Sequence, residues 1–378
     1  MLLKVAVRAL CLAAILTAKS PAAFAQTTGW QQLERCAGLP SAAPLEPFDG
    51  LLVTVDTDAT RVYRAAVATT YVLSFAGGNF LDAGAISPDG RYYAVPNGVI
   101  TTVSNSDVRY VVQEIRIVTT ETVPRIVKRL PWRASFPVGT RFTSSGDIPR
   151  IRWLDNAVIQ FVDGTISEGQ RAVQVDVFSD TAPIEALEIP AISVSPDNTL
   201  ALAIVDGGIS LISLSNGEAL IALPDVLFPS AQVAWSPDSA RFVIAQLRDG
   251  NVALGLFTRD GAALDTVVTL APEQVLWNLR WSPDGSRIAF SAFDPQSLEN
   301  RMVVVDVEAR TVTDTCLPIV ADVDGASLSA LAWSPDGTRL AYITTQGASR
   351  GQIQVYSVND SSRYNLIPAA GRLLGWYP

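Results

Sequence analysis

The stretch AWSPDGTRLAYIT, residues 332–344, joins two runs of strand-forming residues through Ser-Pro-Asp-Gly. Pro335 fixes a backbone φ suited to the second position of a type I turn, Asp336 tolerates the third position, and Gly337 adopts a positive φ without steric cost. The residues after the turn alternate between two faces, as in a β-strand. The stretch therefore predicts a tight hairpin, and a structural turn explains it without a catalytic role for Asp336.

The same pattern recurs along the chain at intervals of 41 to 67 residues. Five copies keep Ser-Pro-Asp, and two degenerate copies have leucine or tyrosine in the place of the serine. Five of the eight tryptophans lie directly before that place. The residues in the serine place are Ser87, Leu154, Ser195, Ser236, Ser282, Ser334 and Tyr377, and the tryptophans are Trp153, Trp235, Trp281, Trp333 and Trp376.

Each interval has room for about four short strands. In the third copy these strands read IPAISV, LALAIV, GISLISLS and ALIALP. Helical patterns do not intervene, which argues against alternating strands and helices. Four strands in every 40–50 residues are typical of the blades of a β-propeller.

The repeat also has a known counterpart. Ser-Pro-Asp-Gly followed by RIAF or RLAY, and then by VVVDV or IQVY, resembles the TolB-like, WD-repeat-like propeller repeat. The resemblance covers roughly residues 50–378 and implies an all-β propeller fold. It implies no single activity, because such propellers serve as binding platforms, as subunits of envelope complexes and as domains beside hydrolases. The sequence shows neither a hydrolase domain nor the second domain of periplasmic TolB, so the role of TolB is not carried over.

The two ends of the chain predict how the ring closes. LLGWYP, the last six residues, matches only the first strand of a blade, whereas LLVTVD, RVYRAAV and TYVLSF precede Ser87 and can supply the other strands. Pairing of the two ends would remove exposed sheet edges. We expect seven four-stranded blades over residues 50–378, with six or eight blades as the alternatives, and an extended segment over residues 26–49.

Residues 1–25 are typical of a signal peptide. Lys4 and Arg8 precede an apolar run that is too short to span a membrane, and Ala23-Phe24-Ala25 offers a cleavage site. Cleavage there leaves 25 basic and 37 acidic residues, and so acidic a chain argues against nucleic-acid binding. We expect a soluble, monomeric protein without a membrane-spanning helix, located in the periplasm or secreted.

The content of cysteine and histidine narrows the chemistry. Cys36 and Cys316 remain after cleavage, and an even number of cysteines in an oxidising compartment favours a disulfide, with two buried thiols as the alternative. The chain has no histidine, which excludes a Ser-His-Asp triad and histidine metal ligands. We therefore expect no metal and no other cofactor.

Polar residues on two first strands form the first candidate site. Most copies carry small or apolar residues before the tryptophan, but two copies carry Arg150 and Arg152, and Asn278 and Arg280. If the first strand is innermost, these side chains lie near the central channel of the propeller. A buried arginine requires a partner. An anionic ligand would supply one, and an acidic residue of the next blade is the alternative.

A basic stretch is the second candidate site. Between residues 109 and 152 there are nine basic residues and three acidic ones. The segment PWRASFPVGTRFTSSGDIP, residues 131–149, shows no strand pattern, and we expect a long loop there. We predict that Arg129, Arg133 and Arg141 contact an acidic partner, with a solvated face as the alternative. The nine basic residues are Arg109, Arg116, Arg125, Lys128, Arg129, Arg133, Arg141, Arg150 and Arg152.

Two classes of function fit these observations. The first is a non-enzymatic exported propeller that binds an envelope protein, an extracellular protein or another anionic ligand. The alternative is a carboxylate-dependent hydrolase of the glycosidase type, because paired Asp and Glu need no histidine. A sialidase-type Asp box requires a residue between Asp and Gly and a Trp after them, and residues 334–340 have neither. The sequence therefore favours binding and leaves enzymatic activity open.

Overall fold

The computed structural model describes residues 30–32, 39–42, 48–55, 59–64, 69–75, 84–104, 107–137, 151–163, 171–186, 191–223, 226, 232–320, 331–344, 352–368 and 372–378. These residues form strands and turns. Within these ranges, no helix is long and apolar enough to cross a membrane.

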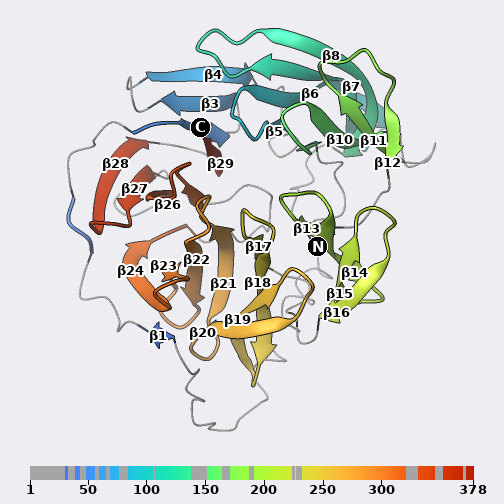
Figure 1. The fold of residues 1–378 in the computed structure, drawn as a ribbon. Coiled ribbons are helices and arrows are strands. Elements are labelled where there is room, and N and C mark those ends of the chain that lie inside the picture. The colour runs from blue at the N-terminus through green and yellow to red at the C-terminus, as the bar shows by residue number, and fades with distance from the viewer. Residues whose placement is uncertain are drawn as a thin grey trace.

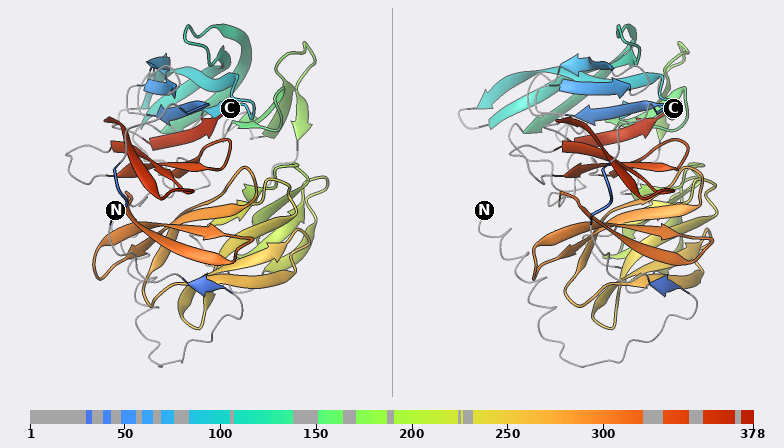
Figure 2. Two further views of the ribbon diagram at one scale, coloured as in Figure 1. Left: turned by 60° about the vertical axis from the view of Figure 1, so that its left-hand side comes forward. Right: turned by 90° about the vertical axis from the view of Figure 1, so that its left-hand side faces the viewer.

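The strands form seven antiparallel sheets, the blades, arranged around a common centre (Figures 1 and 2). Blade 1 contains β5 (Ala85–Ile86), β6 (Tyr92–Ser104), β7 (Asp107–Thr119) and β8 (Ile126–Pro137). Blade 2 contains β9 (Arg152–Trp153), β10 (Val158–Asp163), β11 (Arg171–Asp176) and β12 (Ile184–Ala186). Blade 3 contains β13 (Ala191–Val194), β14 (Leu200–Val205), β15 (Gly208–Ser213) and β16 (Ala219–Leu223).

Blades 4 to 7 follow the same scheme. Blade 4 contains β17 (Val233–Trp235), β18 (Arg241–Arg248), β19 (Asn251–Thr258) and β20 (Ala263–Thr269). Blade 5 contains β21 (Val275–Trp281), β22 (Arg287–Asp294), β23 (Glu299–Asp306) and β24 (Thr311–Pro318). Blade 6 contains β25 (Leu331–Trp333), β26 (Arg339–Thr344), β27 (Gln352–Ser357) and β28 (Ser362–Pro368). Blade 7 contains β29 (Arg372–Tyr377), β2 (Leu51–Val55), β3 (Ala59–Arg64) and β4 (Thr69–Phe75). The prediction of seven four-stranded blades is confirmed.

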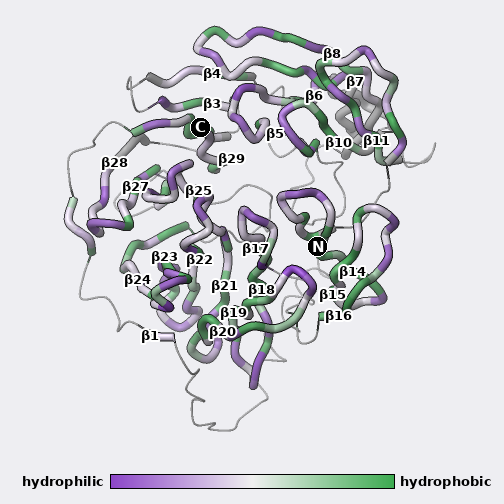
Figure 3. Tube along the Cα trace, viewed as in Figure 1, coloured by the Kyte–Doolittle hydropathy of each residue, from purple (hydrophilic) through white to green (hydrophobic). Residues whose placement is uncertain are grey.

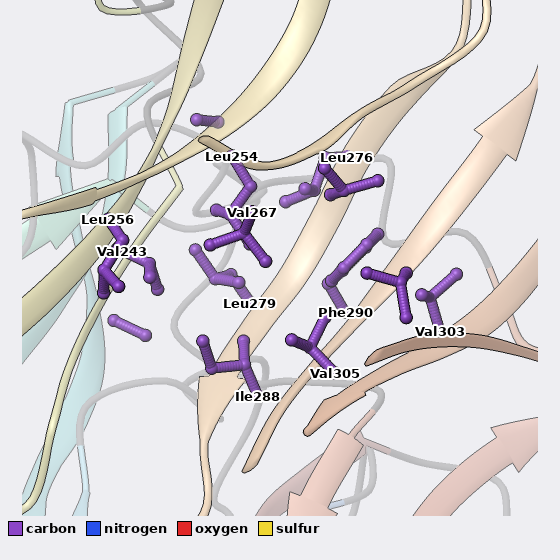
Figure 4. Packing of buried hydrophobic residues seen from close by; sticks show 14 of the residues in the cluster. Val243, Leu254, Leu256, Val267, Leu276, Leu279, Ile288, Phe290, Val303 and Val305 are labelled. Carbon is purple, nitrogen blue, oxygen red and sulfur yellow. The ribbon is translucent and has the colours of Figure 1, made fainter. Parts of the chain in front are cut away.

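The middle strands of the blades are apolar on both faces because each blade packs between two others (Figure 3). In β18, for example, five consecutive residues from Phe242 to Gln246 are buried. The tryptophan of a first strand packs against the preceding blade: Trp281 of blade 5 belongs to a cluster shared with blade 4. Figure 4 shows this cluster, in which Leu254 and Val267 of blade 4 face Leu279 of blade 5.

Blade 7 joins the two ends of the chain. Strand β29 pairs antiparallel with β2, so that Leu52 lies opposite Trp376 and Leu51 opposite Tyr377. Strands β3 and β4 complete the sheet. The prediction that the chain ends pair to close the ring is confirmed.

The Ser-Pro-Asp-Gly turn of blade 7 is itself divided between the two ends. In blade 5, Trp281 Nε1 donates to the carbonyl oxygen of Gly285, four residues further along the chain, at 3.0 Å. In blade 7, Trp376 Nε1 donates to the carbonyl of Asp49, at 3.1 Å. Asp49 therefore occupies the fourth position after Trp376, and Phe48 occupies the third, directly after Pro378. The sequence analysis had not recognised residues 48–50 as the second half of a turn.

The described part of the N-terminal segment lies along the outer edges of blades 4 to 6. Trp30 is buried, and its Nε1 donates to Asp265 Oδ2 of blade 4 at 2.8 Å. Strand β1 (Gln31–Gln32) adds to blade 5 in parallel with β24. Ala42 forms a parallel bridge with Arg363 of blade 6. These contacts cover sheet edges that would otherwise be exposed.

The expectation of a long loop over residues 131–149 is wrong for its first part. Residues 131–137 belong to β8, which pairs with β7 up to the pair Arg109 and Pro137. The prolines conceal this strand in the sequence because they cannot donate a backbone hydrogen bond. An outermost strand tolerates them, since one of its edges faces away from the sheet. Residues 138–149 lie outside the described residues.

Candidate binding face

Each Ser-Pro-Asp-Gly turn satisfies its own polar groups. In blade 6, Ser334 Oγ donates to Asp336 Oδ1 at 2.5 Å, and the Thr338 amide donates to the same oxygen at 3.0 Å. The Arg339 amide donates to Ser334 Oγ at 2.9 Å. The serine and the aspartate therefore hold the turn together, which is the structural function that the sequence suggested.

The hydrogen bonds of these turns keep the carboxylates ionised. At Asp336 burial acts to raise the pKa, but bonds from Ser334 and Thr338 outweigh it, and the pKa lies below its usual value. The pKa values of the aspartates in turns 3, 4 and 5 are lowered as well. A proton donor at neutral pH needs a raised pKa, so these carboxylates suit a structural function better than acid catalysis.

In most repeats, the residue six positions after the tryptophan, or after the residue that replaces it, directly precedes the residue of the second strand that pairs with that position. We name the residue at this place the clasp residue, and in several blades it contacts the next blade. The Arg241 guanidinium lies 5.5 Å from the ring centre of Trp281 in blade 5. Arg287 Nη1 donates to the carbonyl of Gly337 in blade 6 at 3.2 Å. The Arg339 guanidinium lies 5.9 Å from the ring centre of Phe48 in blade 7.

In blade 1 the clasp residue is aromatic. The ring of Tyr92 stacks near Trp153 of blade 2, with ring centres 6.5 Å apart. The sequence analysis missed this function of the repeat. The recurring arginine three residues after the aspartate, in turns 4, 5 and 6, was a signal that could have revealed it.

Arg152 and Arg280 occupy the same position on the innermost strands of blades 2 and 5. Arg152 Nη2 donates to Gln160 Oε1 at 2.6 Å, and burial lowers the pKa of Arg152. Arg280 Nη1 donates to the carbonyl of Leu279 at 3.0 Å. Burial raises the pKa of Tyr377 in blade 7, and the charge of Arg280 opposes this rise. Arg280 therefore acts electrostatically beyond the adjacent blade, as expected of a side chain near the centre of the ring.

The other two residues of this predicted site are placed differently. Asn278 lies at an irregularity in the pairing of β21 with β22, has a positive φ of 56° and is buried. Its Nδ2 donates to Ser291 Oγ at 3.1 Å. Asparagine tolerates this backbone conformation better than most residues, which gives a local reason for its presence. Arg150 lies outside the described residues.

Several described residues of the basic stretch form ion pairs. Arg129 Nη1 and Arg116 Nε each lie 2.7 Å from Glu114 Oε1. Lys128 Nζ lies 2.8 Å from Asp180 Oδ1 of blade 2. Of the other two predicted contact residues, Arg133 belongs to β8 and Arg141 lies outside the described residues.

The chemistry of the described residues gives no sign of a metal centre. Within the described ranges, no group of three or more Cys, Asp and Glu side chains is arranged to hold a metal ion. The predicted polar residues on the innermost strands of blades 2 and 5 carry guanidinium and amide groups, which donate hydrogen bonds and suit an anion.

No protein-family model matches the chain. An alignment over 228 residues that covers 55% of this chain is 26% identical to part of the WD repeat and HMG-box DNA-binding protein 1 of Xenopus laevis. A functionally unknown protein from Desulfotomaculum acetoxidans has a similar structure, with a TM-score of 0.51 at 13% identity, over 85% of this chain and 100% of that one. TolB from Acinetobacter baumannii matches with a TM-score of 0.46 at 16% identity, over 87% of this chain and 82% of that one.

The chain resembles TolB and WD-repeat propellers. The seven blades and the match to a WD-repeat protein bear out the resemblance that the repeat had suggested. The match covers only 18% of the length of the Xenopus protein, so the partners of that protein are not carried over. At these identities the solved structures share the fold alone, and a fold does not decide between a binding protein and an enzyme.

Proposed function

We propose that the protein is an extracytoplasmic, non-enzymatic binding platform that holds an anionic group of a partner near the centre of the ring. One observation carries the proposal: Arg152 and Arg280 hold equivalent positions on the innermost strands of two blades. The other five blades have small residues there, namely Ala85, Ser193, Ala234, Ala332 and Gly375. The two arginines therefore place positive charge at a position of the innermost strand that is uncharged in the other blades.

Partial burial is the physical reason to expect a ligand at Arg152. Desolvation disfavours its charged form, which is why its pKa is lowered. Arginine nevertheless remains protonated in proteins, so the charge must be compensated. Gln160 supplies a neutral acceptor and no countercharge. An anionic ligand would offset the cost of burying the guanidinium and would form a charge-assisted hydrogen bond.

Binding of simple anions tests this proposal. Isothermal titration calorimetry would use a hexaglutamate peptide and, separately, inorganic phosphate. Arg152→Ala and Arg280→Ala should each weaken binding of one probe by about tenfold or more, because a charged hydrogen bond is lost. Arg91→Ala is the control, since its side chain is 78% exposed and lies on a turn. Failure of the wild type to bind either probe, or equal affinity of all variants, would refute the proposal.

The glycosidase alternative has less support. It needs one carboxyl group with a raised pKa to donate a proton. The four turn aspartates with resolved shifts have lowered pKa values and already accept bonds from their own serines. These properties favour binding over hydrolysis.

The basic stretch is a proposed second contact with an acidic protein partner. Its support is the excess of nine basic over three acidic residues between positions 109 and 152. Changing Arg129, Arg133 and Arg141 together to Glu should weaken capture of an acidic partner and leave the protein folded, with a small loss of stability from the broken ion pair of Arg129 with Glu114. Arg125→Glu is the control within the same stretch. Equal capture by the triple variant, independent of salt, would identify the stretch as a solvated face.

An extracytoplasmic location rests on the sequence of residues 1–25, which lie outside the described residues. We propose cleavage after Ala25. N-terminal sequencing of the exported protein should begin at Gln26, and an intact Met1 in that fraction would contradict the proposal.

We also propose a disulfide between Cys36 and Cys316. Cys36 lies outside the described residues, but the pairing of β1 with β24 supports the bond. Gln32 pairs in parallel with Val312, and Cys36 and Cys316 follow these partners by four residues each. Thiol titration of the unreduced, denatured mature protein should find no free thiol, and two free thiols would exclude the bond.

A further inference from the structure

The seams between neighbouring blades are not equivalent. In six of the seven seams, buried apolar residues of both blades form one cluster. Between blades 2 and 3 the described residues form no shared cluster. Ala201, Ala203 and Ile212 of blade 3 cluster only with residues of their own blade.

Blade 2 presents polar side chains to this seam. Ile159 and Phe161 of β10 pack toward blade 1, so Gln160 between them faces blade 3. Directly paired residues of a sheet lie on the same face. The pairing therefore places Arg152, Gln160, Gln174 and Ile184 in one row, from the innermost strand to the outermost. Ile184, at the outer end of this polar row, is 68% exposed.

Blade 3 presents mainly small residues to the same seam. Leu202 of β14 packs toward blade 4, so Ala201 and Ala203 on either side of it face blade 2. Ala201 pairs with Ile212, and Ala203 pairs with Ser210. In blade 3, Val194 replaces the tryptophan of the repeat, so the first strand of this blade places no large aromatic side chain in the seam. Small side chains across from polar ones bury little apolar surface.

In blade 2 a valine takes the place of the clasp residue. In blade 5 the clasp residue Arg287 directly precedes the residue that pairs with Trp281. The turn of blade 2 is one residue shorter, and Val158 directly precedes Ile159, which pairs with Trp153. Ile159 is fully buried toward blade 1, so Val158 lies on the face toward blade 3. Valine has neither the guanidinium group nor the aromatic ring with which the clasp residues of blades 1, 4, 5 and 6 contact the next blade.

One side-chain hydrogen bond links the described parts of blades 2 and 3: Asn198 Nδ2 donates to the carbonyl of Leu154 at 2.6 Å. The seam between blades 3 and 4 has, besides its apolar cluster, an ion pair of Arg259 with Asp197 at 2.5 Å and a bond from the Asp197 amide to Ser239 Oγ at 3.0 Å. The seam between blades 2 and 3 therefore has both less apolar packing and fewer polar contacts than the seam between blades 3 and 4.

We propose that the ring opens between blades 2 and 3, and that this opening exposes the buried Ala201 and Ala203 and the half-buried Arg152, Gln160 and Gln174 to solvent. Local opening occurs where few apolar contacts must be broken. The opening is a property of the seam and holds whether or not Arg152 binds an anion. It makes this seam, and not the junction of the chain ends, the flexible point of the propeller.

Thiol labelling of buried alanines tests the proposal. Ala203 in β14 and Ala289 in β22 are 1% and 0% exposed, and both lie on the second strand of a blade. Ala203→Cys reports on the seam between blades 2 and 3, and Ala289→Cys on the seam between blades 5 and 6. A maleimide should label Ala203→Cys at least about tenfold faster in the native protein. The wild-type protein gives the background of its own cysteines.

Two further variants keep the test decisive. Ala201→Cys repeats the measurement at the same seam, and Ala245→Cys provides a second control in the cluster between blades 4 and 5. Asn198→Gly keeps the positive φ of 55° but removes the bond to Leu154. It should accelerate labelling of Ala203→Cys by several-fold to about tenfold and leave Ala289→Cys unchanged. Equal labelling at all seams, or an unchanged rate with Asn198→Gly, would overturn the proposal.

Discussion

Blade 7 and the seam between blades 2 and 3 differ in a way that runs against chain connectivity. In blade 7 the chain is interrupted within a turn, yet Phe48 packs 4.6 Å from the ring of Trp376 and joins a cluster shared with blade 6. Between blades 2 and 3 the chain is continuous, yet the described residues share one side-chain hydrogen bond and no apolar cluster. The strength of a seam therefore follows from buried apolar contact and not from covalent continuity.

On its other side, blade 7 is also well connected. Thr60 Oγ1 and the Tyr93 hydroxyl lie 3.1 Å apart across the seam with blade 1, and Tyr93 belongs to a cluster with Val53 and Leu73. Tyr71 donates to the carbonyl of Thr120 in blade 1. The junction of the chain ends is thus held on both faces. Five experiments test this difference between the two regions.

The largest effect is expected from deleting residues 372–378. The deletion removes the innermost strand of blade 7, including the buried Leu373 and Trp376. Burial of these side chains and of Leu374 contributes roughly 5–8 kcal/mol, comparable to the whole stability of many domains. We expect an insoluble protein or one without a cooperative thermal melt by circular dichroism. Deleting Pro378 alone is the control, and a full deletion that melts within a few degrees of wild type would contradict the closure described here.

Phe48→Ala should cost about 3–5 kcal/mol, as expected for a large buried aromatic residue. Phe48 is 4% exposed and lies between Trp376 and the Arg339 guanidinium. Urea unfolding followed by tryptophan fluorescence would measure the loss. A change below about 1 kcal/mol would mean that the divided turn does not hold blade 7.

Ser334→Ala and Ser195→Ala each remove the hydrogen bond from the serine hydroxyl to the aspartate of the same turn. The first turn lies in blade 6, beside the well-packed seam with blade 7. The second lies in blade 3, beside the weak seam with blade 2. Each substitution should cost about 1–2 kcal/mol at pH 7, because an aspartate loses a charge-assisted hydrogen bond. The pKa of Asp336 is lowered in the folded state, so its stabilisation is complete above the ordinary value near 3.9 and is lost as the pH falls through the folded-state pKa.

The difference between wild type and either serine variant should therefore shrink progressively as the pH falls below about 4. Urea titrations at pH 7, 4 and 2.5 would measure it. If the difference in unfolding free energy between wild type and a serine variant did not change with pH, the stabilisation by these serines would not depend on the ionisation of their aspartates.

Asn198→Gly removes the bond between turns 3 and 2 and should cost about 1 kcal/mol. Asn156→Gly is the matched control, because Asn156 Oδ1 accepts from the Asp89 amide across the well-packed seam between blades 1 and 2. Both variants should melt at slightly lower temperatures in a calorimetric scan. The comparison fails if Asn156→Gly loosens its seam, measured by thiol labelling, as much as Asn198→Gly loosens the other.

The smallest effect is expected from Arg241→Lys. Lysine retains the charge but not the planar group that lies over Trp281, so the loss should be about 0.5 kcal/mol. Arg241→Ala should lose about 1 kcal/mol. If both variants match wild type in urea unfolding, the clasp residue contributes nothing measurable to its seam.

Much of the fold could be predicted because the repeat states it locally. Pro335 and Gly337 define one turn, and six related turns at regular intervals define the blades. The strands LLVTVD and LLGWYP at opposite ends of the sequence predicted the closure. What could not be predicted depends on a shift of one residue, such as the shorter turn before Ile159. β8 was hidden for another reason: its prolines are tolerated only because the strand is outermost.

The candidate site was predicted less completely. The sequence placed Arg152 and Arg280 on first strands, but it could not show that Arg152 donates to Gln160 or that the charge of Arg280 acts on Tyr377. It also could not show that Arg129 pairs with Glu114, because the pair depends on how β7 and β8 align. These contacts join residues whose proximity follows from strand register and blade packing.

The blades follow from the sequence alone, because turn chemistry and strand alternation act over a few residues and repeat along the chain. How the blades meet depends on tertiary contacts. Whether a seam gains a clasp residue, a shared apolar cluster or a polar row depends on which faces the strand register turns toward each other. In blade 2 the register turns Arg152, Gln160 and Gln174 toward blade 3, and no local preference of the sequence reports that result.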